Sequence, residues 1–232
     1  MVVAGIEIEV ERKAIRNMHL AVYPPDGRVH ISVPEFCTDD DVRAYVLRKT
    51  EWIRRQIASF ATCERESVRE YVSGENHYLF GKRYVLKVVY ADAPPMIKLG
   101  HKYMTMQVRK GATVEKRAEL MHEFYRQQLA DKLPAIFDKW SAKTDEHHFT
   151  WSVRIMKTQW GSCHNDKREI FMNLLLARVP IPCIEYVAVH ELTHLKVRHH
   201  SHAFELYLTL YMPDWRSRKQ ELDGFIVGEW QM

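Results

Sequence analysis

Two stretches of strand-type alternation occupy much of the first half of this chain of 232 residues, and each is followed by a helical pattern. Residues 6–33 alternate apolar and polar side chains around a turn at 24–27, which predicts a strand and a hairpin. Residues 78–108 repeat this alternation around a second turn at 91–95. The first part of the chain is therefore expected to be rich in β-strands, within an α+β fold.

Two long helices are expected after these strands. An acidic run at residues 39–41 precedes apolar residues at helical spacing, which predicts a helix that runs to near Cys63 with its negative charges at the positive end of the helix dipole. Apolar residues recur at helical spacing again over 113–140, with Pro134 as the expected kink or break. We place a domain boundary near Gly111, with a β-rich accessory region at 1–110 and a compact second part at 111–232, although the two could pack as one unit.

The second part mixes short strands with helices. Alternation at 151–155 and an apolar run at 170–174 predict a short antiparallel pair. A helix should follow Pro180, which suits a first helical turn, and should continue to about Val197. A further helix is expected from Ser201 as its cap to Tyr211.

Composition limits the classes of protein to which the chain can belong. The first residues lack a basic start and carry three glutamates, and no run of about 18 uncharged apolar residues occurs, so we expect neither an export signal nor a membrane span and place the protein in the cytoplasm. The four cysteines are widely spaced and form no CxxC pair, so free thiols are expected rather than a disulfide framework.

The net charge of +4 is unevenly distributed. Residues 1–110 carry 18 Lys and Arg against 14 Asp and Glu, whereas 111–232 carry 16 of each. A solvated surface is the simpler interpretation of this excess, because no basic run interleaved with aromatic residues stands out. Nucleic acid remains a minor alternative as a partner.

The sequence His-Glu-Leu-Thr-His at 190–194 carries the strongest chemical signal. In a helix, positions i and i+4 lie on one face, so His190 and His194 can bind one cation. Glu191 lies about 100° round the helix from His190, where it can address a water on the metal as a general base. The alternative is that the motif arose by chance. Residues 122–126 also begin with His-Glu, but they lack the second histidine and so predict no metal site.

A catalytic zinc normally has three protein ligands, and several candidates for the third follow the motif. His200 completes a His-x3-His-x5-His spacing, which requires the chain to turn sharply after the helix. Val197 strongly disfavours the positive φ that a sharp turn requires, and His199 tolerates it better. We therefore expect His199 to form the turn and not to bind the metal. His202 and the carboxylate of Glu205 remain alternatives to His200.

The chain resembles the YgjP-like metallopeptidase family, which is related to SprT-like and WLM-type minimal zincins. The residues that carry the resemblance are Thr158-Gln159-Trp160-Gly161-Ser162-Cys163, Ile170 to Leu174, Pro180, Tyr186-Val187, His190 to Leu195, His199-His200-Ser201, Phe204, Pro213 and Trp215. The resemblance covers most of the chain and implies a zincin-like metallopeptidase domain with His200 as the third ligand. The family usually has Asn at position 199 and Arg at position 159, so Gln159 removes a positive charge.

The segment Trp160-Gly161-Ser162-Cys163 has two interpretations. It could be a rim strand that holds an extended peptide by strand addition, or a structural segment in which Trp160 packs on the active-site helix. Asn173 at a strand end is expected to tie down a turn rather than to bind substrate.

Together these features favour a zinc-dependent metallopeptidase that hydrolyses peptide bonds, with Zn²⁺ on His190, His194 and His200 and Glu191 as the general base. The motif specifies activation of water and not a side-chain pocket, so another amide substrate is the first alternative. A non-catalytic zinc module that contacts nucleic acid is the second, although a closed structural site has no need of Glu191.

Overall fold

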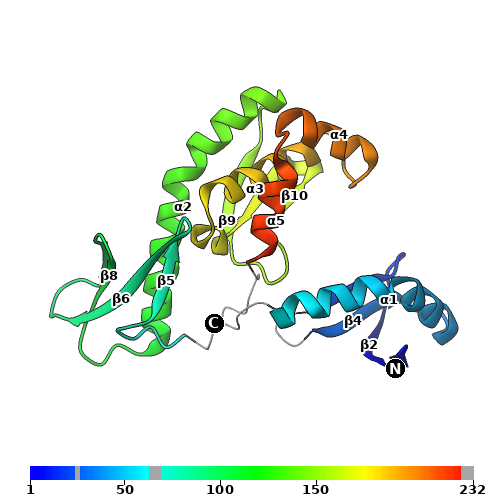
Figure 1. The fold of residues 1–232 in the computed structure, drawn as a ribbon, viewed down its shortest axis with the longest axis horizontal. Helices are drawn as coiled ribbons and strands as arrows, with labels where there is room; N and C mark the ends of the chain where they lie inside the picture. Colours follow the sequence, from blue (N-terminus) through cyan, green and yellow to red (C-terminus); the bar gives the residue numbers. More distant parts are fainter. Residues whose placement is uncertain (24–26, 63–68, 226–232) are drawn as a thin grey trace. The chain divides into compact units, whose positions relative to one another are not determined.

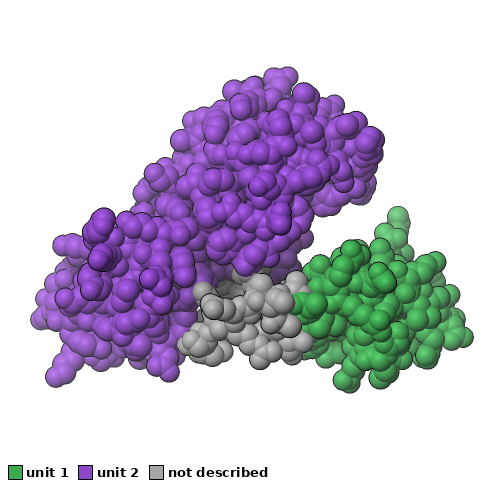
Figure 2. All heavy atoms as spheres, in the orientation of Figure 1, with its two compact units in different colours: residues 1–67 green, residues 68–232 purple. Residues whose placement is uncertain are grey.

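The computed structural model describes residues 1–23, 27–62 and 69–225. The chain divides into two compact units, residues 1–67 and 68–232 (Figure 2). The expected boundary near Gly111 thus lies inside the second unit, because the strands of residues 76–108 share one hydrophobic core with the helices that follow. Cys63 lies outside the described residues, and Cys37, Cys163 and Cys183 are free thiols.

The first unit is a four-stranded sheet with one helix. Its strands are β1 (Val2–Val3), β2 (Ile6–Lys13), β3 (His19–Tyr23) and β4 (Arg28–Pro34), in the spatial order β1-β2-β4-β3. Strands β3 and β4 form the expected hairpin, and β2 pairs with β4 in parallel. The predicted helix is present as α1 (Asp39–Thr62). Its start is fixed by Asp41, whose carboxylate accepts hydrogen bonds from the backbone N–H and the hydroxyl of Thr38 at 2.9 and 2.7 Å.

The second unit begins with another four-stranded sheet. Strands β5 (Asn76–Leu79), β6 (Lys82–Tyr90), β7 (Met96–Leu99) and β8 (Tyr103–Val108) lie in the order β5-β6-β8-β7, with β6 parallel to β8. Alternate residues of these strands are buried, such as Leu86 on β6 and Met104 and Met106 on β8. They pack with α2 (Val114–Thr144), so one face of the sheet faces the core.

Helix α2 runs from this sheet to the part of the unit that holds the helices α3, α4 and α5 (Figure 1). It begins at the N-cap Thr113, whose hydroxyl accepts from the N–H of Lys116. The helix continues through Pro134, where we expected a kink or break. Pro134 is exposed, and Leu133 and Phe137 on either side are buried, so packing of the apolar stripe offsets the lost backbone hydrogen bond.

A three-stranded sheet and three helices complete the unit. Strands β9 (Thr150–Arg154), β10 (Gly161–His164) and β11 (Glu169–Asn173) lie in the order β10-β11-β9, and the 3-10 turns η1 (Asn165–Lys167) and η2 (Leu174–Arg178) flank β11. We expected β9 and β11 to be antiparallel, but they are parallel. The antiparallel partner of β11 is β10, because the chain crosses over and returns through β10 before it enters β11.

The remaining helices are α3 (Ile181–His194), α4 (His202–Tyr211) and α5 (Trp215–Asp223). Helix α3 ends three residues before the expected limit at Val197, and α4 begins directly after Ser201 as predicted. The described residues thus hold five α-helices and three small sheets, which confirms the α+β class. No helix in the described part of the chain is both long and apolar enough to cross a membrane.

Candidate active site

The site is built on α3, which is almost entirely apolar in its first two turns. Pro180 occupies the N-cap position and Pro182 lies in the first turn, where a missing backbone N–H costs little. Most of the helix is buried, including Val187, Ala188 and Leu192. This burial fixes the rotation of the helix, so that His190 and His194 face the surface on one side.

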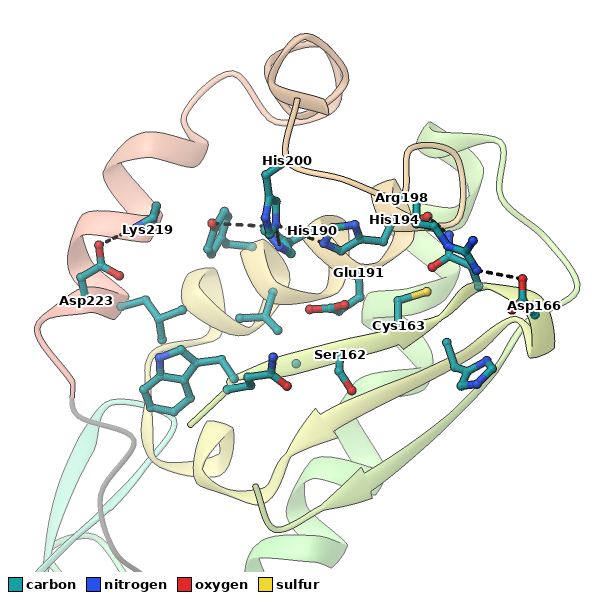
Figure 3. Close-up of a pocket in the computed structure, with 18 residues that line it drawn as sticks. Ser162, Cys163, Asp166, His190, Glu191, His194, Arg198, His200, Lys219 and Asp223 are labelled. Atoms are coloured by element: carbon teal, nitrogen blue, oxygen red, sulfur yellow. Dashed lines mark hydrogen bonds and ion pairs between the residues drawn. The ribbon is translucent and has the colours of Figure 1, made fainter. Parts of the chain in front are cut away.

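The imidazoles of His190, His194 and His200 converge at the end of α3 (Figure 3). The Nε2 atom of His200 lies 2.9 Å from Nε2 of His190 and 3.1 Å from Nε2 of His194. Three nitrogens held tetrahedrally at about 2.0–2.1 Å from one zinc ion lie about 3.3 Å apart. Both of these distances from His200 are thus within about half an ångström of the separation that zinc requires, and all three ligand atoms lie within 4.8 Å of one another.

Hydrogen bonding sets the orientation of two of these rings. The Nδ1 atom of His194 donates to the carbonyl oxygen of Val197 at 3.2 Å, because a carbonyl can only accept. In the neutral ring Nε2 then carries the lone pair that points into the cluster. The hydroxyl of Tyr186 lies 3.5 Å from Nδ1 of His190. The Tyr186 ring in turn stacks on the ring of Trp215, with an interplanar angle of 8°.

Phe204 of α4 forms a common floor for the three rings. Its ring centroid lies 4.9 Å from that of His190, 4.6 Å from that of His194 and 4.8 Å from that of His200. The side chain is only 1% exposed. The position of α4 therefore sets how deeply all three imidazoles lie. The sequence did not predict this role of Phe204, because it depends on packing between separate helices.

Burial favours the neutral imidazoles that bind metals. It lowers the pKa of His190 to about 3, with smaller contributions from the neighbouring charges of His194 and His200. Burial also lowers the pKa of His194. A neutral imidazole is the form that coordinates a metal, so this site needs no deprotonation step near neutral pH.

Glu191 lies between the three imidazoles and strand β10 (Figure 3). It is 4% exposed, and its Oε2 atom has no hydrogen-bond partner in the described part of the chain. Burial raises the pKa of Glu191 to about 8. A buried carboxyl group without a partner is costly for folding alone, and it is typical of a functional site.

Gly161 is the residue of β10 that allows this approach. A Cβ atom at position 161 would lie 2.6 Å from Oε1 of Glu191 and 2.8 Å from Cγ1 of Val187. The absence of a side chain therefore lets the strand backbone pass directly beside the carboxylate. Among the strands of the described residues, β10 pairs with β11 alone and forms one edge of its sheet.

Two polar contacts hold the loops around the cluster. The side-chain amide of Asn165, just beyond β10, donates to the carbonyl oxygen of His194 at the end of α3. Arg198 forms an ion pair with Asp166 at 2.9 Å between the same two loops. These contacts fix the segment 195–200, which brings His200 back to the helix.

Asn173 has the structural role that we expected. It is fully buried, and its amide group donates to the carbonyl oxygens of Met156 and Gln159 at 2.8 and 2.7 Å. Its side-chain oxygen accepts from the N–H of Leu175 at 3.1 Å. Every polar atom of the side chain is thus used to hold the loop that leads into β10.

The cluster opens into a cleft of about 560 Å³. Trp160, Tyr186, Val187 and Leu222 give one part of the lining an apolar character. The side chains of Lys219 and Asp223, which pair with each other on α5, lie at one end of the cleft, and the Arg198–Asp166 pair lies at the other (Figure 3).

The other candidate ligands lie outside the cluster. His199 is exposed at the bend that we assigned to it, but none of the residues 195–200 has a positive φ. The chain instead turns through hydrogen bonds from Lys196 and Val197 to the carbonyl oxygen of Thr193. His202 begins α4 and is exposed, and Glu205 pairs with Arg216 at 3.3 Å. Burial raises the pKa of Cys163 to about 12, which disfavours a thiolate nucleophile.

Comparison with known protein families shows to which family the chain belongs. A family model described as "YgjP-like, metallopeptidase domain" matches residues 16–225. The chain belongs to the YgjP-like metallopeptidase family. The match includes both compact units, so the hairpin and helix α1 of the first unit are also part of the family's pattern.

Two solved structures with similarity to this family member are metallopeptidase zymogens. Abylysin of Pyrococcus abyssi is 15% identical, with a TM-score of 0.36, over 38% of this chain and 90% of its own. Jannalysin of Methanocaldococcus jannaschii is 16% identical, with a TM-score of 0.36, over 39% of this chain and 93% of its own. No curated protein matches the chain.

Proposed function

We propose that the protein is a zinc-dependent metallopeptidase whose metal ligands are His190, His194 and His200 and whose general base is Glu191. The observation that carries the proposal is the convergence of three imidazole nitrogens beside a buried carboxyl group whose Oε2 atom has no hydrogen-bond partner among the described residues. A structural zinc site would have four protein ligands, whereas three leave a position open for water. Membership of a metallopeptidase family supports the same reaction.

The choice of zinc rests on the donor set. Three neutral imidazoles at the observed spacing suit zinc, whereas magnesium and calcium prefer donor sets made of oxygen atoms. Zinc, when bound, acts as a Lewis acid and lowers the pKa of water toward about 7.

Glu191 would then move the proton. Its carboxylate accepts a proton from the attacking water and passes it to the leaving amine as the peptide bond breaks. The dry surroundings of Glu191 raise its pKa, so the protonated form that this second step requires is accessible near neutral pH. A cation held by the three histidines would lower the pKa of Glu191 again, and so would favour the carboxylate form before the reaction.

Strand β10 suggests how a peptide binds. Residues Gly161, Ser162 and Cys163 line the cleft and lie on an edge strand, whose free backbone groups can pair with an extended peptide. The cleft continues past the cluster on both sides, as the charged pairs at its two ends indicate. An open cleft of this kind accepts the middle of a chain, so we propose an endopeptidase.

Hydrolysis of a different amide is the second candidate, since the zinc motif specifies activation of water and not a side-chain pocket. A non-catalytic zinc module is disfavoured by Glu191, because a closed structural site has no need of a buried carboxyl group whose Oε2 atom is unpaired among the described residues.

The deciding experiment compares bound metal and peptide hydrolysis in the wild type and in Glu191→Gln. We expect one zinc per chain in both proteins by elemental analysis, and cleavage of a mixed peptide library that falls by roughly 10²–10⁴-fold in the variant. Hydrolysis that survives the substitution would remove Glu191 from the mechanism, and absence of zinc from both proteins would overturn the proposal.

The third ligand is tested with its neighbours as matched controls. His200→Ala should weaken zinc binding by more than roughly 100-fold, because even partners of the ligands usually contribute 10–100-fold. His199→Ala and His202→Ala remove imidazoles from the same segment but outside the cluster, so they should keep the wild-type affinity. A loss of zinc in His202→Ala but not in His200→Ala would reassign the ligand.

A further inference from the structure

The excess of basic residues in the first part of the chain belongs to the β5–β8 sheet. Residues 1–68 carry 10 Lys and Arg against 11 Asp and Glu, whereas 69–110 carry 8 against 3. Of the three acidic residues, Glu75 contacts His77 at 3.1 Å and Asp92 lies 3.9 Å from Arg109. The positive charge of this region is therefore largely uncompensated within the sheet.

The strand registers place three of these eight basic residues on one face. Residues that alternate with the buried ones point away from the core, and in the registers of the four strands they form neighbouring rows. These outward residues are Asn76, Tyr78, Arg83, Val85, Lys87, Val89, Met96, Lys98, Tyr103, Thr105 and Gln107. None of them is acidic, and we call this surface the outer sheet face.

Three basic side chains stand on the outer sheet face without partners. Arg83, Lys87 and Lys98 are exposed, and none of them forms an ion pair in the described part of the chain. Lys87 and Lys98 lie in one row, on either side of Thr105, about 10 Å apart across two strand spacings. Their charges are thus free to pair with an external anion.

Aromatic and aliphatic surface lies between these charges. Tyr103 is 53% exposed and lies two residues from Thr105 on β8, about 7 Å along the strand from the lysine row. Tyr78 is paired with Arg83 across β5 and β6. Val85 is half-buried and is paired with Tyr103 across β6 and β8, two residues from Arg83.

We propose that the outer sheet face binds single-stranded nucleic acid, with Lys87, Lys98 and Arg83 on phosphates and Tyr103 stacked on a base. An open sheet face with exposed aromatic rings among basic residues provides both interactions that a single strand offers. An acidic protein would use the charges but would gain nothing specific from an exposed aromatic ring. A duplex hides its bases, so it also leaves Tyr103 unused.

The test is binding of the full-length chain to fluorescent 20-nucleotide oligo(dT) and oligo(rU), followed by anisotropy at several salt concentrations. Lys87→Glu/Lys98→Glu should weaken binding at least tenfold and lower the magnitude of the salt slope by about 1.4, since each phosphate contact of a single strand contributes about 0.7. Lys49→Glu/Lys132→Glu is the matched control, because it changes the net charge equally at two exposed helix positions. Equal weakening by both pairs, or no binding at low salt, would overturn the proposal.

Tyr103 separates nucleic acid from other polyanions. Tyr103→Ala should weaken oligonucleotide binding roughly tenfold and Tyr103→Phe should preserve it, because stacking needs the ring and not the hydroxyl. A poly-glutamate peptide that competes as well as the oligonucleotide, together with no effect of Tyr103→Ala, would assign the face to an acidic protein. Preference for a duplex of the same length would also exclude a single-strand site. All four variants lie outside the cleft and should keep zinc and peptide hydrolysis.

Discussion

At the scale of single residues, the candidate site depends on how closely groups approach Glu191. Its carboxyl group is buried between the imidazoles of α3 and the backbone of β10, and it gains no hydrogen bond on Oε2 in exchange. Gly161 leaves the space for it. The sequence shows the glycine in the segment at 160–163, but only the folded chain shows which side chain fills the space beside it.

We expect Gly161→Ala to reduce peptide hydrolysis by roughly 100-fold while leaving zinc bound. The added methyl group would lie 2.6 Å from Oε1 of Glu191, so the carboxylate must move away from the position in which it serves as base. The measurement is kcat together with zinc stoichiometry. Gly100→Ala is the control, because its methyl group meets nothing closer than 3.4 Å; full activity in both variants would contradict the role given to Gly161.

His77 gives the second unit a dependence on pH that is separate from the site. It is 1% exposed, and burial, followed by the charge of Arg69, lowers its pKa to about 4 from an ordinary value of 6.5. The unfolded chain therefore binds more protons between these values, so this contribution to stability is complete above pH 6.5, decreases as the pH falls below 6.5, and is fully lost once the pH has dropped through about 4.

The size of this effect is about 3 kcal/mol in the free energy of unfolding. Urea unfolding at pH 7 and at pH 4.5 measures it, and His77→Gln should reduce the difference between the two pH values. An unchanged difference in the variant would assign the acid sensitivity to other groups, among which the half-buried His122 also has a pKa lowered to about 4.

At the scale of elements, the periodic patterns were the reliable part of the sequence analysis. The starts of α1 and α4 and the histidine face of α3 follow from spacing and caps alone, and the structure has them where the patterns predict. Strand β10 does not follow from periodicity, because its four residues Gly-Ser-Cys-His show no alternation, and a rim strand is one of two interpretations of residues 160–163. The parallel pairing of β9 with β11 arises because the chain passes through β10 between them.

The remainder of the candidate site depends on tertiary packing that no local pattern records. The contact between Asn165 and the end of α3 joins residues 29 positions apart. The position of α4, which places Phe204 below the three imidazoles, is set by the bend at 198–199 and by the core beneath the helix.

We expect Phe204→Ala to weaken zinc binding at least tenfold in addition to lowering stability by about 3–5 kcal/mol, because it removes the floor of the imidazole cluster. Leu208→Ala is a matched change on the same helix, at a residue equally buried but one turn further from the histidines. Zinc titration of both variants separates a positioning role from a loss of stability. Equal zinc affinities in the two would leave Phe204 a purely structural role.

At the scale of the whole molecule, each of the two units has its own hydrophobic core. The first core is formed by the strands β1, β2 and β4 and the helix α1, and the second by α2, α3 and the elements packed on them. All residues of the candidate metal site lie in the second unit. We propose residues 68–232 as the catalytic unit, with 1–67 as the accessory unit.

Scanning calorimetry of the full chain tests this division. We expect two unfolding transitions, one for each unit. Zinc should raise the midpoint temperature of the transition of residues 68–232 alone, by roughly 10 °C at a free zinc concentration of 1,000 times Kd. Removal of zinc with a chelator should reverse the shift. A single transition that moves as a whole with zinc would show that the two units unfold together.

The third histidine also changes the connectivity of the polypeptide. Because His190 and His200 would hold the same ion, these two residues and the nine between them become a small closed ring. Opening the last turn of α3 then requires the rupture of a metal–nitrogen bond, although the amides of Leu195, Lys196 and Val197 otherwise lie in a helix end of the kind that frays. Hydrogen exchange at these three amides should therefore follow the rate at which the metal dissociates. The exchange rate would then report the residence time of the ion.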